Sequence, residues 1–391
     1  MVYSMLRLYW SIFQTRSRMT EIRPICRIIR SCAEIDKSRC IGYFCTAPKE
    51  IEPTDWGNDM QTRDYRIDIL RSVSAFCVVV IHVVSASVTY NDAAVAQATV
   101  WQMNVVHNLS SWAVPVFFMI TGFCVMGDDR ECTWQWTFGH IGKFVGILFT
   151  VGWFYALLEY IYMEKSVSLR AVGLALVDVL NGDTWTHMWY IYYIIGIYLV
   201  LPVVKSHIVQ NQRNVGCLSG LLFLSTILIP AVNGWMGLSI DMHLPMSGYM
   251  FYVVTGAMIS RCRFSKMKYI NAALAAVNVV TVIYVLEHGK DEIYPYTSLP
   301  VCMMALSIFA LMAWNPVGLH IGRKWVGLSE CTLGIYLIHP FFLNLMIKLL
   351  HIYPLHGMAW ISIPAACMVL YFGSYATVYV LRKLPIVNRL F

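Results

Sequence analysis

The stretch ILRSVSAFCVVVIHVVSASVTY, residues 69–90, decides the fold. About 20 residues of α-helix cross the roughly 30 Å hydrocarbon core of a bilayer, and this apolar stretch is long enough to do so. Two of its side chains, Arg71 and His82, are costly in hydrocarbon unless they face a pocket, water or a partner. The stretch therefore predicts a transmembrane helix with a possible functional role.

Nine more apolar stretches follow. Hydrophobic residues make up 58% of the 391 residues and charged residues only 13%, whereas roughly a quarter of the residues in a soluble domain are charged. This composition excludes a water-soluble globule and predicts an all-α polytopic membrane protein. We expect about ten transmembrane helices with short connections, at residues 69–90, 108–127, 143–163, 187–204, 215–231, 244–260, 269–287, 297–315, 329–350 and 358–381.

The connections predict how the chain is inserted, because Lys and Arg collect on the cytoplasmic side. Successive connections lie on alternate sides of the membrane. Those on one side, together with the C-terminus, hold thirteen Lys and Arg residues, among them Lys205, Arg261 and Arg382, and those on the other side hold four. We therefore expect both termini in the cytoplasm. The net charge of +7 is spread over these connections and forms no basic face, which excludes nucleic acid as a partner.

Residues 1–59 mix acidic and basic side chains and contain no apolar run long enough to span a membrane. We interpret them as a poorly structured or wrongly included extension, and residues 60–391 as the membrane domain. Our hypothesis is that Met60 is the natural initiator, which N-terminal sequencing of the protein from its native locus tests. The four cysteines of the extension match none of the paired zinc-ligand spacings, so no metal site is expected.

Arg71 and His82 are eleven helical steps apart, which end about 20° beyond three full turns and rise about 16 Å. Both side chains thus lie on one face, Arg71 near the cytoplasmic edge and His82 slightly past the membrane midplane. Asp68 is close enough to pair with Arg71. One interpretation is that Arg71 reaches lipid headgroups and His82 bonds a neighbouring helix. The other is that a buried neutral imidazole accepts a proton while Arg71 steadies an anion.

The segment from Arg66 to His82 resembles the first helix of the acyltransferase-3 family of integral membrane acyltransferases, which carries an Arg, ten residues and a His. Three further segments are similar to later helices of that family, in the same order. They are AVPVFFMITGF at 113–123, THMWYIYYIIGIYLVLP at 186–202 and GIYLIHP at 334–340. The resemblance covers about residues 60–385.

The resemblance implies transfer of an acyl group, most often acetyl, from cytoplasmic acyl-CoA to a hydroxyl of a surface carbohydrate or lipid-linked glycan of the cell envelope. The enzyme would be a multi-pass protein of the plasma membrane, in contact with membrane lipid. His82 is then the general base, Arg71 anchors the donor or stabilises charge, and Asp68 orients Arg71. Acetyl-CoA is a co-substrate, and no bound cofactor is required. No Cys or Ser stands out as a nucleophile, so direct transfer is expected.

The other similar segments carry polar and helix-breaking residues. Pro115 cannot donate to the carbonyl of Ser111, so we expect a kink there, and Gly122 permits close approach of another helix. These two residues could also serve packing alone. His187 and Trp189 begin the fourth span at the outer surface, where aromatic residues are typical of the membrane interface. We interpret both as acceptor contacts.

In the ninth span Thr332, Tyr336 and His339 recur at i, i+4 and i+7 and form one polar stripe. We expect Tyr336 and His339 to bind substrate, with hydrogen bonding between helices as the alternative. Family members commonly carry several Arg or Lys before the third helix, which suit the phosphates of coenzyme A. This chain has fewer basic residues there, and the expected donor-binding residues are Arg130, His140 and Lys143.

Two other functional classes remain open. A transporter or exporter of a small polar metabolite or glycan precursor is one, because polar residues near the midplane also line substrate paths. Paired broken helices in inverted halves would favour it, and the sequence shows none. The other class is an inactive membrane scaffold.

Overall fold

The computed structural model describes residues 63–90, 96–127, 131–166, 168–206, 211–240, 248–262, 267–315, 319–355 and 359–384. Within these ranges every regular element is a helix, which confirms the predicted all-α fold. The extension at residues 1–59 and Met60 lie outside the described residues.

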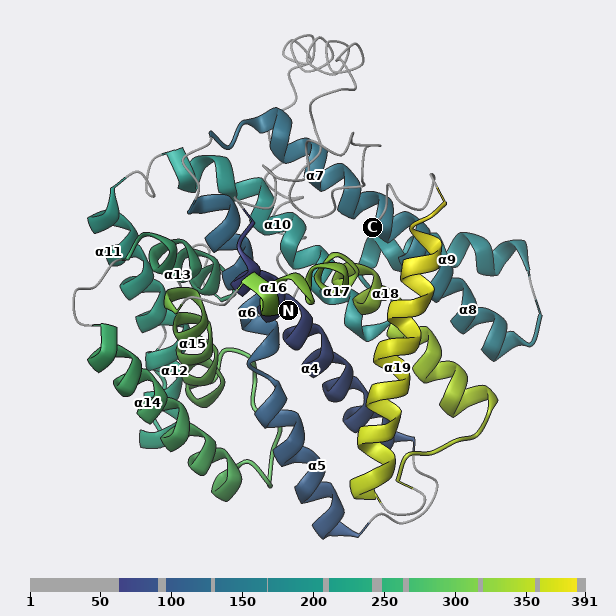
Figure 1. Ribbon diagram of the computed structural model, residues 1–391. Helices are drawn as coiled ribbons and strands as arrows, with labels where there is room; N and C mark the ends of the chain where they lie inside the picture. Colours follow the sequence, from purple (N-terminus) through teal and green to yellow (C-terminus); the bar gives the residue numbers. More distant parts are fainter. Residues whose placement is uncertain are drawn as a thin grey trace. The chain divides into compact units, whose positions relative to one another are not determined.

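The helices follow one another along the chain as Figure 1 shows. Their bounds are α4 (Tyr65–Thr89), α5 (Gln97–Ser110), α6 (Ala113–Thr121), η2 (Gly122–Met126), α7 (Trp134–Ile147), η3 (Leu148–Gly152), α8 (Trp153–Glu164), α9 (Leu169–Asn181), η4 (Thr186–Met188), α10 (Trp189–Val204), α11 (Gln212–Phe223), η6 (Leu224–Leu228), α12 (Ile229–Met236), α13 (Met250–Arg261), α14 (Met267–His288), α15 (Leu299–Trp314), α16 (Leu319–Arg323), α17 (Val326–Glu330), α18 (Thr332–Asn344), η7 (Leu345–Leu349) and α19 (Ala359–Leu381).

Eight helical stretches of the described chain are long and apolar enough to cross a membrane. They overlap eight of the predicted spans and make the chain a multi-pass membrane protein. The other two predicted spans, 244–260 and 297–315, coincide with the shorter helices α13 and α15. Nearly all of α13 is buried, whereas α14 buries only Thr281 and Val285 and is peripheral.

The prediction of a short connection between the third and fourth spans is wrong, because α9 lies there. Ser168 caps this helix by accepting a hydrogen bond from the Ala171 N–H at 3.0 Å. Gly182 ends it in the left-handed region, with φ of 78°. Ala171, Ala175 and Val179 are buried, and α9 packs against α8.

Helix α4 packs against α5, α6, α18 and α19 (Figure 1). The Asp64 side chain caps its first turn by accepting from the Arg66 N–H at 3.1 Å. Just before the helix, Arg63 Nη1 donates to Glu330 at 2.9 Å, and Arg382 Nη1 donates to the same carboxylate at 3.4 Å. The beginning of α4 and the end of α19 therefore lie on the same side of the helices.

The kink predicted at Pro115 is present as a break between α5 and α6, at Ser111 and Trp112. Helix α5 begins at Gln97, well before the predicted start at residue 108. Its polar residue Asn108 is fully buried and donates to the carbonyls of Gly289 and Glu292, both at 2.8 Å. The second span is therefore fastened to the connection between α14 and α15.

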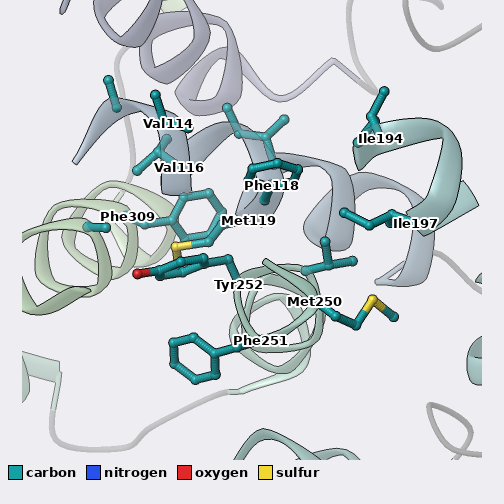
Figure 2. Packing of buried hydrophobic residues seen from close by; sticks show 14 of the residues in the cluster. Val114, Val116, Phe118, Met119, Ile194, Ile197, Met250, Phe251, Tyr252 and Phe309 are labelled. Carbon is teal, nitrogen blue, oxygen red and sulfur yellow. The ribbon is translucent and has the colours of Figure 1, made fainter. Parts of the chain in front are cut away.

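Glycines allow α13 to lie directly against the second span. A Cβ added at Gly122 would lie 1.8 Å from the Val253 carbonyl oxygen, and one at Gly256 would lie 2.1 Å from the Met119 carbonyl oxygen. The close approach predicted from Gly122 is therefore confirmed. Figure 2 shows the side chains that pack around this contact, with Met119 near Tyr252.

Candidate functional site

Three histidines from three helices meet at one point. The ring centroids of His82 in α4, His187 in η4 and His339 in α18 are 5.2 to 6.3 Å apart. His187 is 3% exposed and His339 is fully buried, whereas His82 is partly exposed. Among the described residues, no group of three His, Cys, Asp or Glu side chains has the arrangement of a metal site. The cluster is thus a set of imidazoles in contact with one another.

Two of these rings have a buried nitrogen without a hydrogen-bond partner among the described residues, and in His339 this nitrogen is an acceptor. The Nδ1 atom of His339 lies 2.8 Å from the Ile335 carbonyl oxygen. Since a carbonyl oxygen only accepts, Nδ1 carries the proton, and in the neutral ring Nε2 is an acceptor. The buried Nε2 atoms of His339 and His187 find no hydrogen-bond partner among the described residues. A ligand or water that donates to them would remove the cost of leaving them unsatisfied.

Aromatic residues hold the backbone of His187 against α18. The Tyr336 hydroxyl donates to the His187 carbonyl oxygen. The Tyr155 hydroxyl donates to the Leu337 carbonyl oxygen at 2.5 Å, and its ring stacks on Trp185 with centroids 4.2 Å apart and planes at 3°. Tyr336, expected to bind substrate, therefore also positions His187.

A large polar cavity, here named the vestibule, opens on one side of the three histidines. Its volume is about 720 Å³, and its lining includes Glu159, Asp178, Asp183, Asn344 and Lys348. Lys348 Nζ lies 3.2 Å from the Glu159 carboxylate. With three carboxylates and one ammonium, the vestibule has a net negative lining.

A small apolar cavity, here named the chamber, lies on the other side. Its volume is about 50 Å³, and its apolar lining includes Val78, Val114, Phe117 and Leu333. His82, His187, Trp189 and Tyr296 line both the chamber and the vestibule. The imidazole of His82 therefore lies at the boundary between an apolar space and a polar one.

Arg71 lies beyond the chamber. Its Nη2 atom is 3.7 Å from Cys124 Sγ, and its charge acts on Tyr190, which lines the chamber. Val78, between Arg71 and His82 along α4, also lines the chamber. Arg71, the chamber, His82 and the vestibule thus follow one another along α4.

Two cations lie at the C-terminal end of η2, near Cys124. Lys205 Nζ donates to the Val125 carbonyl oxygen at 2.7 Å, and Arg261 Nη2 donates to the Met126 carbonyl oxygen at 3.1 Å. Cations are stabilising at this end of a helix, whose last carbonyls lack partners within the helix. The sequence analysis counted both residues as topology charges; for Arg261, as part of a basic cluster with Arg263, Lys266 and Lys268, a grip on the donor is the alternative interpretation.

The structure describes two of the three expected donor-binding residues, His140 and Lys143. Arg130 lies outside the described residues. The His140 ring packs on Trp136 and Tyr198, with centroids 4.0 and 5.6 Å away, and Arg71 acts electrostatically on Tyr198. His140 thus packs on Tyr198, a residue of α10. Lys143 follows about one turn later on α7 and is partly exposed.

Asp68 has a partner that the sequence analysis did not propose. Both its carboxylate oxygens accept from Arg63, from Nε at 2.8 Å and from Nη2 at 3.1 Å. Burial lowers the pKa of the Arg63 guanidinium, but hydrogen bonds and charge from Asp68 and Glu330 outweigh it and leave the pKa above its usual value. The orientation of Arg71 by Asp68 stays a prediction.

The sequence analysis also did not single out Glu159 and Lys348, which pair in the vestibule. A signal was present, because both residues fall within predicted spans, where charged side chains are costly without a pocket or a partner. Trp185 and Tyr155 could not have been predicted as site residues. The sequence contains many aromatic residues, and nothing in the residue type or spacing of these two distinguishes them from the others.

Comparison with known proteins places Arg71, the three histidines and the residues of both cavities in one family domain. A family model described as an acyltransferase domain matches residues 64–379, a range that includes Arg71 and the three histidines. The searches of curated proteins and of solved structures find no match to the chain.

Proposed function

The chain belongs to the acyltransferase-3 family, and we propose that it transfers an acyl group, acetyl first, from cytoplasmic acyl-CoA to a hydroxyl of a surface carbohydrate or lipid-linked glycan. Membrane acyltransferase activity follows from the family. The donor, the acceptor and a location in the plasma membrane are the proposed part. The observation that carries the proposal is the position of His82 between the chamber and the vestibule.

The distribution of charge supports donor access from the Arg71 end. Lys205 and Arg261 lie at that end near Cys124, whereas Asp178 and Asp183 line the vestibule. Because basic residues collect on the cytoplasmic side, the Arg71 end is the side on which acyl-CoA is available. The vestibule then faces the opposite side, where surface glycans are found.

In this proposal His82 is the general base. An acceptor hydroxyl in the vestibule gives its proton to the imidazole while its oxygen attacks the thioester carbonyl. The carbon–sulfur bond then breaks, the acyl group stays on the acceptor oxygen as an ester, and the coenzyme A thiolate leaves and takes up a proton. Arg71, about 16 Å away along α4, holds an anionic group of the donor while the long flexible arm of coenzyme A spans the distance.

The remaining expected residues act on the acceptor side or hold the donor. His187 and Trp189 line the vestibule and are proposed to contact the acceptor. His339 lines neither cavity, and its ring lies against that of His82, with centroids 5.2 Å apart. Tyr336 holds His187 in place. Arg130, His140 and Lys143 are proposed to contact the donor on the cytoplasmic side.

The test uses the full chain purified in lipid nanodiscs, with acetyl-CoA labelled in the acetyl group and a mixture of neutral and amino-sugar oligosaccharides. We expect label to appear in a saccharide ester with release of one free thiol per ester. A transporter would leave the thioester intact. If neither the oligosaccharides nor water receives the label, the proposed function is wrong.

Arg71→Lys is expected to raise the KM for acetyl-CoA. The variant keeps the charge but loses the planar guanidinium that holds an anion through two hydrogen bonds. A hydrogen bond to a charged group contributes about 1.5–3 kcal/mol, so the KM should rise about tenfold to hundredfold. Steady-state kinetics with varied acetyl-CoA measures this rise. The control is Arg213→Lys, at an exposed residue of α11, and an Arg71→Lys enzyme with normal KM would show that charge alone suffices.

A further inference from the structure

The chamber has the dimensions of a very short acyl thioester. Its volume open to the centre of a water molecule is about 50 Å³. Since roughly 10–15 Å³ in this measure holds one water molecule, the chamber has room for about three to five non-hydrogen atoms. An acetyl thioester brings a sulfur, a carbonyl carbon, an oxygen and a methyl group, which falls within this range, and a propionyl thioester brings one carbon more.

The position of the chamber also suits the reacting end of the donor. It lies between Arg71 and His82 along α4, and His82 is part of its wall. A thioester seated there would have its carbonyl next to the acceptor hydroxyl that His82 deprotonates. Acyl carbons that do not fit must displace the walls or enter the vestibule, where the acceptor binds.

The walls that set the length are packed side chains. Val78 and Val114 are 5% and 8% exposed, and the ring of Phe117 lies 6.4 Å from that of Tyr190. Close-packed interiors resist added volume, because extra methylene groups force neighbouring side chains and backbone out of place. Widening the chamber for a longer acyl chain therefore costs free energy.

We propose that the chamber receives the acyl thioester and restricts the donor to acyl groups of about two or three carbons, with Phe117 and Val78 as the residues that set this limit. The inference rests on the proposed function and names the acyl class used at the same site. Phe117 and Val78 are specificity residues and take no part in proton transfer.

The experiment compares acetyl-, propionyl-, butyryl- and hexanoyl-CoA with the same oligosaccharide mixture. One methylene in a hydrophobic pocket changes kcat/KM by about 10–200-fold. For the unaltered protein we therefore expect a fall of at least about tenfold from acetyl to butyryl and a further fall to hexanoyl.

Phe117→Ala and Val78→Ala each enlarge the chamber and should raise the ratio of butyryl to acetyl transfer by about tenfold or more. The ratio is measured within one preparation, so it does not depend on how much of a variant folds. The matched control is Phe341→Ala, which removes a half-buried ring of α18 that lines neither cavity. Its ratio should equal that of the unaltered protein.

The outcomes separate this inference from the proposed function. If the unaltered protein transfers acetyl and hexanoyl groups equally well, the chamber does not set acyl length, although the protein is still an acyltransferase. The same conclusion follows if neither enlarged variant changes the ratio. If no acyl-CoA is consumed under any condition, the proposed function itself is wrong and the inference is overturned with it.

Discussion

His82→Gln is expected to lower acetyl transfer about 10²- to 10⁴-fold, the range that a positioned general base contributes. Glutamine is of similar size and still forms hydrogen bonds, but its amide does not accept a proton at neutral pH. The KM for acetyl-CoA should change little, because in the proposed mechanism the donor is held at the Arg71 end of the chamber. Initial rates of labelled ester formation in nanodiscs measure both quantities.

The control for this variant is His288→Gln. His288 lies at the end of α14, stacks on Tyr284 with centroids 4.6 Å apart, and lines neither cavity. It should transfer acetyl groups at the normal rate. A His82→Gln protein that elutes as a folded species and retains full activity would remove His82 from the catalytic role and leave the interhelical interpretation.

Gly256→Ala is expected to have the largest effect on stability. The new Cβ would lie 2.1 Å from the Met119 carbonyl oxygen, a backbone atom that cannot swing aside. Helices α6 and α13 would have to separate, which loosens the packing of Met119 and Tyr252 between them (Figure 2). Overpacking of this kind costs about 1–3 kcal/mol or more, so the Tm in detergent should fall by several degrees.

The matched control is Gly220→Ala in α11, a helix that also packs on α13. Nothing lies within 4 Å of the Cβ that this change adds. Alanine is the better helix former by about 1 kcal/mol, so the Tm should stay level or rise. Equal Tm values for Gly256→Ala and the unaltered protein would contradict the close helix contact.

The sequence predicted the parts of this structure that depend on local chemistry. Apolar runs of membrane-spanning length predicted the helices. The missing N–H of Pro115 predicted the break at Ser111, and the absent side chain of Gly122 predicted the close contact with another helix, which is α13. Each follows from one residue or one run without knowledge of its neighbours in space. The spacing of Arg71 and His82 likewise placed them on one face of α4.

The parts that the sequence did not predict depend on tertiary contacts. His187 and His339 were each chosen as substrate contacts, but nothing in their spacing shows that both rings meet His82. Asp68 was expected to pair with Arg71, three residues away, while the strong bidentate partner is Arg63, which precedes the helix and folds back. Helix α9 was missed because its short amphipathic sequence lies between two much more apolar runs.

In the proposed function the protein works on both faces of a bilayer, and such a protein must also keep the two sides separate. Protons and ions cross membranes through continuous files of water, and narrow apolar constrictions stop them by staying dry. In the proposed mechanism the chamber, with apolar walls that include Val78, Phe117 and Leu333, would be such a constriction between the Arg71 end and the vestibule. The chamber that limits the length of the acyl group would thus also protect the electrochemical gradient. A variant with a wider chamber, which accepts longer donors, would let protons and ions cross the membrane of the cells that express it.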